Sequence, residues 1–176
     1  MPKNVMVVGT GTIGEPLIGL LAEHKDALGL DNVLFFKRTP LSDEKGKVEA
    51  LLRKGSKIVS SSDALSDFKQ LGFSEIEDVD NAYEDADVII DCTPSGNENW
   101  KSIYSSLDQS KRFMAQGSEH GFGQFFAWGI NNDVLENGSN KYLIASCNTH
   151  NIASIVKTFA LDQGRELVEG QFVCLR

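Results

Sequence analysis

A cysteine at the start of an expected helix is the most reactive candidate in this sequence. Cys147 stands in the segment "IASCNTHN", where an apolar, strand-like run changes into a helical pattern. The unpaired amides and the positive dipole end at a helix start stabilise a thiolate. Cys147 is therefore a candidate nucleophile, and an unreactive cysteine in a capping region is the alternative.

The remaining cysteines and histidines offer weaker chemistry. His150 follows Cys147 by three residues and so lies on about the same helix face, which makes a Cys–His pair a candidate. Cys92 lies within a strand-like run and is expected to be a small buried residue. His24 and His120 are interpreted as surface residues. Three cysteines without a CxxC spacing predict neither a disulfide framework nor a metal site.

A glycine motif follows the first apolar run, residues 5–8. Gly9, Gly11 and Gly14 form GxGxxG at the mouth of a helical pattern. Here the first glycine permits a tight turn, the second lets the backbone approach a pyrophosphate, and the third lets helix and strand pack closely. The alternative is a structural glycine turn. The motif predicts a dinucleotide site formed by Gly9, Thr10, Gly11, Thr12, Ile13 and Gly14.

The residues at the end of the second strand indicate which dinucleotide binds. "NVLFFKRTP" ends with Lys37, Arg38 and Thr39 and carries no acidic residue there. A carboxylate at this position would bind a ribose 2′-hydroxyl, whereas cations accommodate a 2′-phosphate. The segment therefore favours NADP, or use of both NADP and NAD, over strict NAD. Two solvated charges at a strand end are the alternative.

Further cofactor contacts are expected where two later strands end. "ADVIIDCTP" is a continuous apolar run typical of an interior parallel strand, and it ends beside the expected ligand crevice. Thr93, Pro94 and Gly96 are candidate neighbours of the nicotinamide or ribose. Gln116 and Gly117, at the end of "RFMAQGS", complete the predicted cofactor-binding set.

Strands and helices alternate along the whole chain. Strands are expected in "SKIVS" and "KYLIASC" besides those above, with helices at 45–54, 63–71 and from 148 to a stop at Gly164. Residues 75–85 are interpreted as a polar acidic stretch and 117–133 as a long glycine-rich connection. The final segment, "RELVEGQFVCLR", is β-like. This alternation predicts an α/β fold with a doubly wound, mostly parallel sheet of the Rossmann type.

Composition limits the function classes. The 176 residues make about one domain, and 17 basic against 25 acidic residues give a net charge of −8. This balance disfavours nucleic acid and anionic membranes as partners. A hydrophobic content of 41% excludes a disordered tail. No apolar run is long enough to span a membrane and no signal-peptide pattern is present, so a cytoplasmic protein is expected.

The motifs in their order resemble those of a known family. "GTGTIG", "FFKRTP", "EDADVIIDCTPSG", "QGSE", "WGIN" and above all "ASCNTHN" are similar to the coenzyme-binding half of glyceraldehyde-3-phosphate dehydrogenase, closest to the archaeal, phosphorylating type. The resemblance covers residues 4–176. It implies a glycolytic oxidoreductase that oxidises an aldehyde phosphate with NAD or NADP and captures the product with inorganic phosphate.

The resemblance also assigns roles to residues. It makes Cys147 the nucleophile that forms a thioester, and gives Asn148 and Thr149 the task of holding the substrate or acyl group. A homo-oligomer is implied as well. One departure is that "CNTHN" replaces the family-like "CNTTG", which places His150 and Asn151 where the family has other residues.

A second departure concerns length. Only 29 residues follow Cys147, whereas the family continues into a second domain that contributes the catalytic histidine. We therefore expect residues 1–164 to be the dinucleotide domain and 165–176 to begin the first strand of a substrate domain, with the isolated chain inactive. Two alternatives stay open: a non-catalytic NAD(P)-binding module, and another cysteine-dependent aldehyde or semialdehyde dehydrogenase on the same fold.

Overall fold

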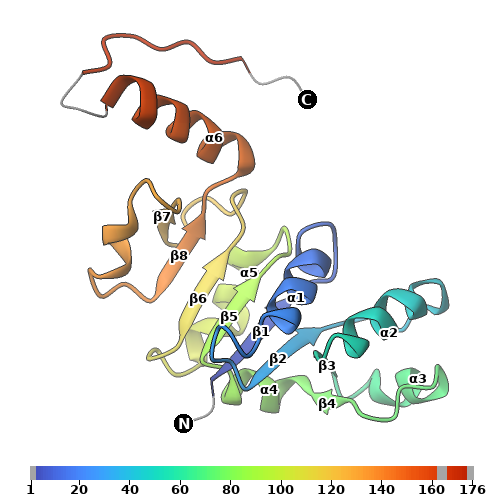
Figure 1. Ribbon diagram of the computed structural model, residues 1–176. Coiled ribbons are helices and arrows are strands. Elements are labelled where there is room, and N and C mark those ends of the chain that lie inside the picture. The colour runs from blue at the N-terminus through green and yellow to red at the C-terminus, as the bar shows by residue number, and fades with distance from the viewer. Residues whose placement is uncertain (1–2, 162–165, 174–176) are drawn as a thin grey trace.

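Eight parallel strands form a single sheet. The structure is a computed structural model that describes residues 3–161 and 166–173. The strand order is β4-β3-β2-β1-β5-β6-β8-β7, and every neighbouring pair is parallel (Figure 1). The strands are β1 (Asn4–Val8), β2 (Asn32–Phe36), β3 (Lys57–Ser60), β4 (Glu77–Asp78), β5 (Val88–Asp91), β6 (Arg112–Ala115), β7 (Gln124–Phe126) and β8 (Lys141–Ile144).

The strand order reverses between β1 and β5. From β1 the chain adds β2, β3 and β4 on one side, and β5 then begins the other side of the sheet. In doubly wound sheets, ligands bind beyond the carboxyl ends of the strands at this point of reversal. The predicted Rossmann-type fold is confirmed, and the sheet is parallel throughout.

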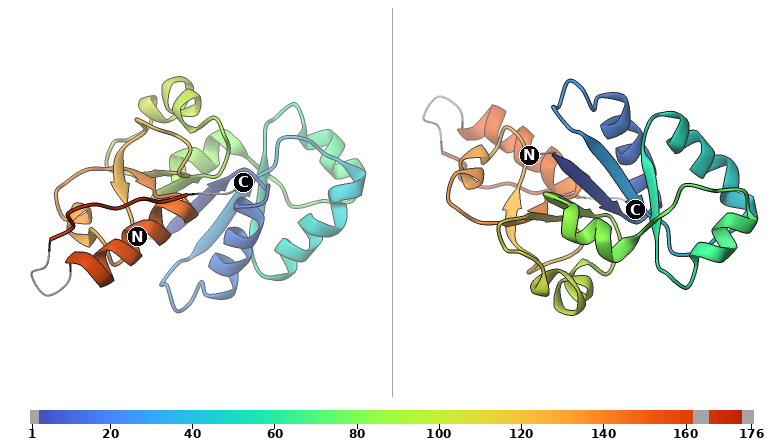
Figure 2. Two further views of the ribbon diagram at one scale, coloured as in Figure 1. Left: turned by 90° about the horizontal axis from the view of Figure 1, so that it is seen from above. Right: turned by 90° about the horizontal axis from the view of Figure 1, so that it is seen from below.

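Helices cover both faces of the sheet (Figure 2). Side chains of β1 alternate between two cores, with Met6 and Val8 packed in one and Val7 in the other, as the two-residue period of a strand requires. Helices α1, α2 and α3 contribute to the core of Val7, while α4 contributes to the core of Met6. The helices are α1 (Gly14–Glu23), α2 (Lys45–Arg53), α3 (Leu65–Gln70), α4 (Val79–Asp85), α5 (Gly96–Ser102) and α6 (Cys147–Val156).

Residues 75–85 are more ordered than their polar composition indicates. They contain β4 and α4, so "ADVIIDCTP" supplies the fifth strand. Asp78 begins α4 by accepting a hydrogen bond from the amide of Asp80, and Val79, Ala82 and Tyr83 are buried at helical spacing. Sequence analysis missed this helix because its three buried positions are outnumbered by polar and acidic residues that face solvent.

The long connection and the chain end also differ from expectation. Residues 117–133 include β7, which pairs with β8. Helix α6 ends at Val156, and a π-helical turn, Lys157–Leu161, follows it. Gly164, the expected stop of this helix, lies outside the described residues. Residues 166–173 form no strand, because none of the sheet's strands pairs with them, so the expected final strand is wrong for the described part of this segment. None of the helices described is both long and apolar enough to cross a membrane.

Candidate functional site

An open cleft of about 560 Å³ lies beyond the carboxyl ends of β1, β2 and β5. The register pairs Val8 with Asp91, so the loops that follow β1 and β5 begin side by side. The predicted cofactor residues that line the cleft are Gly9, Thr10, Lys37, Arg38, Thr39, Thr93 and Pro94. The lining residues that sequence reasoning missed are Val8, Phe36, Tyr83, Ser95, Glu98, Asn99 and Ile103.

The three motif glycines are constrained in different ways. Gly9 has a φ of +99°, and a Cβ there would lie 3.0 Å from Cγ2 of Thr93. A Cβ on Gly14 would lie 1.9 Å from the carbonyl oxygen of Gly9, so close packing of α1 on the turn requires glycine. Gly11 has no atom within 4 Å of its Cβ position. No contact within the protein therefore requires a glycine at position 11, whereas a ligand that approaches the backbone closely would require one.

The start of α1 fits a pyrophosphate group. Ile13 caps the helix without a side-chain hydrogen bond. Among the described residues, the backbone amides of Gly11, Thr12 and Ile13 have no hydrogen-bond acceptor. Free amides at a helix start bind anions because the helix dipole adds to their donor capacity. These residues and the cleft beside them fit a dinucleotide.

The end of β2 brings the two predicted cations into different surroundings. Lys37 is 8% exposed and forms an ion pair and hydrogen bond with Glu44. Arg38 and Thr39 are exposed beside the cleft, and Arg38 has no ion-pair partner in the part of the chain that the structure describes. Of the two cations, Arg38 is the one free to meet a ligand.

A buried carboxylate organises the loop after β5. Asp91 accepts hydrogen bonds from the amide and hydroxyl of Thr93, at 2.8 and 2.6 Å, through Oδ1. Its Oδ2 accepts from Nδ2 of Asn99 at 2.7 Å and from the hydroxyl of Tyr104 at 2.8 Å. Four donors satisfy a side chain that is 0% exposed. Asp91 therefore fixes Thr93 at the edge of the cleft, and its position at a strand end was the available sequence signal.

Groups near Asp91 are held in their protonated forms. Burial, followed by the charge of Asp91, raises the pKa of Cys92 to about 11. Burial raises the pKa of Tyr83 to about 12. Cys92 is thus a thiol at neutral pH, and its side chain is only partly buried, whereas a buried residue was expected.

The predicted nucleophile is exposed at the start of α6. Ser146 caps this helix by accepting a hydrogen bond from the amide of Thr149 at 3.3 Å, and the two hydroxyls are 2.8 Å apart. Sγ of Cys147 lies 4.0 Å from Oδ1 of Asn148. The predicted catalytic residues Cys147, Asn148 and Thr149 all lie in the first turn of α6. Thr149 also takes part in the hydrogen bonds that cap the helix.

Two contacts connect the helix of Cys147 with the loop beside the cleft. A Cβ on Gly117 would lie 2.5 Å from the backbone nitrogen of Ser146, so the two backbones are in close contact. The side chain of Gln116 donates to the carbonyl oxygen of Thr93 at 3.3 Å. Gln116 and Gly117 do not line the cleft. They link its edge to the residue that precedes Cys147.

The candidate Cys–His pair is absent. Nε2 of His150 lies 3.0 Å from the carbonyl oxygen of Trp128, an acceptor, so this nitrogen donates to the loop. Lys157, the first residue of the turn after α6, donates to the carbonyl oxygen of Gly129 at 2.6 Å. His150 therefore helps to hold α6 on the 128–130 loop, and in the described structure it makes no hydrogen bond with Cys147.

Gly96 lies beside the cleft without lining it. A Cβ there would lie 3.1 Å from Cγ of Glu119 and 3.2 Å from Cβ of Ala115. Glu119 is buried and accepts a hydrogen bond from the amide of Asn97 at 2.8 Å. These contacts give Gly96 a packing role where the start of α5 meets β6.

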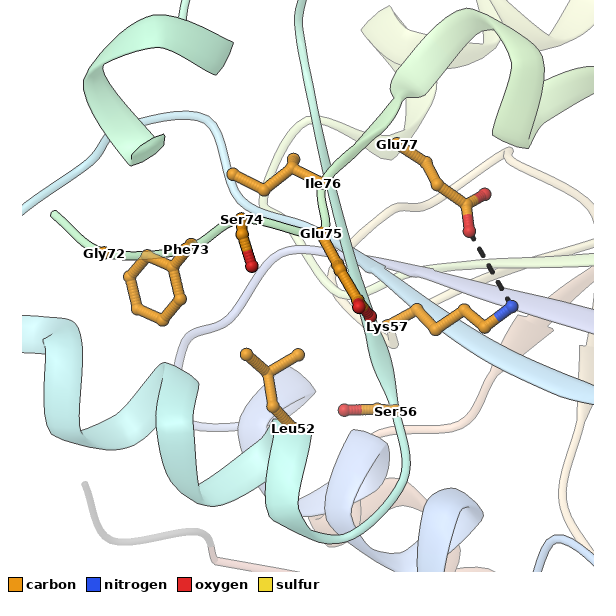
Figure 3. Close-up of a pocket in the computed structure, with 9 residues that line it drawn as sticks. All are labelled: Leu52, Ser56, Lys57, Gly72, Phe73, Ser74, Glu75, Ile76 and Glu77. Carbon is orange, nitrogen blue, oxygen red and sulfur yellow. Dashed lines mark ion pairs between the residues drawn. The ribbon is translucent and has the colours of Figure 1, made fainter. Parts of the chain in front are cut away.

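A second hollow, of about 610 Å³, lies away from this site (Figure 3). Its wall includes Lys57, the first residue of β3, so it opens beside the amino end of that strand. The Lys57 ammonium lies 3.7 Å from Glu77, and Figure 3 marks this ion pair with a dashed line. The hollow lies at the opposite end of the strands from the glycine turn, and it is therefore separate from that turn and from Cys147.

Comparisons with known proteins show a partial likeness. No protein-family model matches the chain. Curated glyceraldehyde-3-phosphate dehydrogenases are similar to it: that of Pyrobaculum calidifontis is 29% identical over 162 residues, covering 90% of this chain and 44% of the relative. That of Pyrobaculum arsenaticum is 30% identical with the same coverage, and that of Sulfolobus acidocaldarius is 27% identical over 174 residues, covering 97% and 48%. The chain spans about half the length of the curated relatives it matches.

The likeness expected from the motifs is thus confirmed as similarity to part of these dehydrogenases. A crystal structure of glucose dehydrogenase from Haloferax mediterranei matches with a TM-score of 0.47 and 17% identity, covering 89% of this chain and 41% of that one. The assignment of the fold rests on this chain's own parallel sheet and its order.

Proposed function

We propose that this chain is the coenzyme-binding, thiol-bearing part of an NAD(P)-dependent oxidoreductase that acts on an aldehyde phosphate, as glyceraldehyde-3-phosphate dehydrogenase does. The observation that carries the proposal is the contact between Gly117 and Ser146, which couples Cys147 to the loop of Thr93. A thiol-dependent dehydrogenase needs its nucleophile at the nicotinamide end of the dinucleotide site. The similarity to curated dehydrogenases supports the same assignment.

Each part of the chain then has a task. The amides of residues 11–13 bind the pyrophosphate, and Arg38 and Thr39 meet the adenosine ribose. Thr93, held by Asp91, and Pro94 border the nicotinamide end. When bound, the dinucleotide accepts a hydride.

Cys147 carries out the covalent step. Its thiolate would attack the aldehyde carbon, forming a C–S bond while the carbonyl π bond breaks and its oxygen takes a proton from the acid form of a base. The hemithioacetal would then return this proton to the base and give its hydrogen as hydride to the bound dinucleotide, which leaves a thioester. Inorganic phosphate then displaces the thiolate from the thioester and yields an acyl phosphate. The start of α6 stabilises the thiolate at both ends of this cycle.

The base is the part that the described residues do not provide. His150 is bonded to the Trp128 carbonyl, and the thiol of Cys147 has only the contact with Asn148. This favours a second domain as its source, with the dinucleotide domain at residues 1–164 and the next domain from 165. The similarity to curated dehydrogenases supports, as part of the same proposal, a homo-oligomer in the cytoplasm. The same observation favours, as a second candidate, a module that binds the dinucleotide without turnover.

Binding of the dinucleotide is tested with paired glycine variants. Gly11→Val fills the space where the pyrophosphate would approach, and Gly46→Val adds the same side chain on α2, where the Cβ also has no atom within 4 Å. Calorimetry with NADP and NAD should show binding by the wild type and Gly46→Val and its loss in Gly11→Val. Equal affinity in all three proteins would contradict the site.

The role of the thiol is tested by intact-mass analysis. The chain incubated with glyceraldehyde 3-phosphate should form a hemithioacetal on Cys147, seen by native mass spectrometry, that Cys147→Ser does not form, because addition of the thiol needs no base from a second domain. Dinucleotide binding without such an adduct would support the binding module instead.

A further inference from the structure

Lys37 is a buried cation whose charge is matched by a single acid. Its backbone is fixed at the end of β2, where the amide donates to Val59 O at 3.1 Å and the carbonyl accepts from Ser60 Oγ at 2.8 Å. Its side chain is 10% exposed and pairs with Glu44, the last residue of the 3₁₀ turn Ser42–Glu44. A buried ammonium requires such a partner because desolvation of an isolated charge is costly.

The two residues lie on opposite sides of a boundary. Lys37 and Thr10 line both the dinucleotide cleft and a small adjoining pit, whereas Glu44 lines only the pit. The ion pair therefore directs the ammonium towards the pit and away from the cleft. The hydrogen bond from Lys37, reinforced by the charges of Lys37 and Lys47, lowers the pKa of Glu44, so this carboxylate is ionised at neutral pH.

The pair changes what a phosphate in the cleft would meet. A 2′-phosphate beside Lys37 alone would gain a charge-assisted hydrogen bond in partly desolvated surroundings. With Glu44 bound, the same phosphate meets a neutral pair and a nearby negative charge, so the attraction is largely cancelled. Arg38, exposed and without an ion-pair partner among the described residues, is unaffected by this cancellation.

We propose that Glu44 is a specificity-determining residue, which limits the selection of 2′-phosphorylated dinucleotides by neutralising Lys37. This inference rests on the proposed dinucleotide site. It makes Glu44, a residue outside the strand end, the acid that moderates the preference for NADP. Removing its charge frees Lys37 for the ligand.

The test uses two probes that differ only in the phosphate concerned, adenosine 5′-monophosphate and adenosine 2′,5′-bisphosphate. Calorimetry gives the ratio of their dissociation constants for the wild type and for Glu44→Gln. We expect Glu44→Gln to raise the preference for the bisphosphate about tenfold, mainly through tighter binding of that probe. Glu44→Gln/Lys37→Met should lose this gain, because the freed ammonium is its source.

Glu15→Gln is the matched control. Glu15 lines the same pit and pairs with Lys47 at 3.5 Å, so this substitution removes an equal charge without touching Lys37. Its effect on the ratio should stay below about twofold, since any long-range effect acts on both probes. A similar gain in Glu15→Gln would show a general charge effect and overturn the role of Glu44.

A thermal shift measurement separates specificity from stability. Glu44→Gln leaves a buried ammonium without its partner, so the free protein should melt at a lower temperature and gain more from the bisphosphate than the wild type does. Lower stability with equally weakened binding of both probes would show a structural role only. An unchanged ratio with both probes bound overturns the role of Glu44 alone, whereas binding of neither probe by the wild type overturns the dinucleotide site itself.

Discussion

Tyr104 donates a hydrogen bond from its hydroxyl to Oδ2 of Asp91 at 2.8 Å, although the two residues are only 1% and 0% exposed. Burial and the negative charge of Asp91 raise the pKa of the Tyr104 hydroxyl, so it stays a donor at any working pH. The other three donors to Asp91 come from Thr93 and Asn99. The edge of the cleft is thus built on a buried anion.

Removing the hydrogen bond from Tyr104 to Asp91 should lower both the stability of the fold and the affinity for the dinucleotide. Tyr104→Phe removes one of the two donors to Oδ2 of the buried Asp91 and leaves Asn99 as the other, and we expect the free energy of unfolding to fall by about 1–3 kcal/mol in urea titrations. Affinity for the dinucleotide should fall with it, because the carboxylate whose Oδ1 holds Thr93 is then less firmly fixed. The control is Tyr142→Phe, which removes the hydroxyl that donates to Ser139 O at 2.6 Å. Equal losses of affinity in both variants would contradict a specific role for Asp91.

The two described cysteines should react at very different rates. With a pKa of about 11, Cys92 is ionised in roughly one molecule in a thousand at pH 8, and it is partly buried, whereas Cys147 is exposed at a helix start. Brief treatment with iodoacetamide and mass mapping should find Cys147 modified first. The rate at Cys92 should rise about tenfold per pH unit up to pH 10, because its thiolate fraction does. Cys174 lies outside the described residues. Faster reaction of Cys92 at pH 8 would count against Cys147 as the nucleophile.

Arg38, the cation without an ion-pair partner at the end of β2 among the described residues, should determine the preference between NADP and NAD. We expect NADP to bind more tightly than NAD, and Arg38→Ala to weaken NADP about tenfold to a hundredfold, the worth of charge-assisted hydrogen bonds. Affinity for NAD should change little. Arg53→Ala, at the exposed end of α2, removes the same charge away from the cleft and should leave both affinities unchanged. An NADP preference that survives Arg38→Ala would assign the selection to other residues.

The sequence was sufficient for the elements that bury a continuous apolar run. Residues 88–90 predict an interior strand, and the spacing of Gly9, Gly11 and Gly14 predicts the turn into α1, because both signals are local. Helix α4 was missed, since its buried face is only Val79, Ala82 and Tyr83 among acidic residues.

The partners of site residues were harder to predict than the residues. Glu44 pairs with Lys37 across a turn, and His150 bonds to Trp128, which precedes it by 22 residues. Such contacts depend on how the elements pack, and no spacing in the sequence encodes them. Asp91 is an intermediate case, because its strand-end position was visible while its four donors were not.

Apolar side chains exposed after α6 lead to a prediction of self-association. Phe159 is 73% exposed and Val168 is 98% exposed, and α6 itself has no buried residue. Exposed apolar surface of this kind favours association, because pairing removes it from water. We expect light scattering to show a mass that rises with concentration, and Phe159→Ser/Val168→Ser to reduce this rise while NADP affinity stays the same, since the glycine turn belongs to another part of the fold. Leu20→Ser is the control, because Leu20 is 55% exposed on α1 and should not contribute. A constant monomer mass in the wild type, or equal effects of both substitutions, would show that the segment after α6 is not where the chains meet.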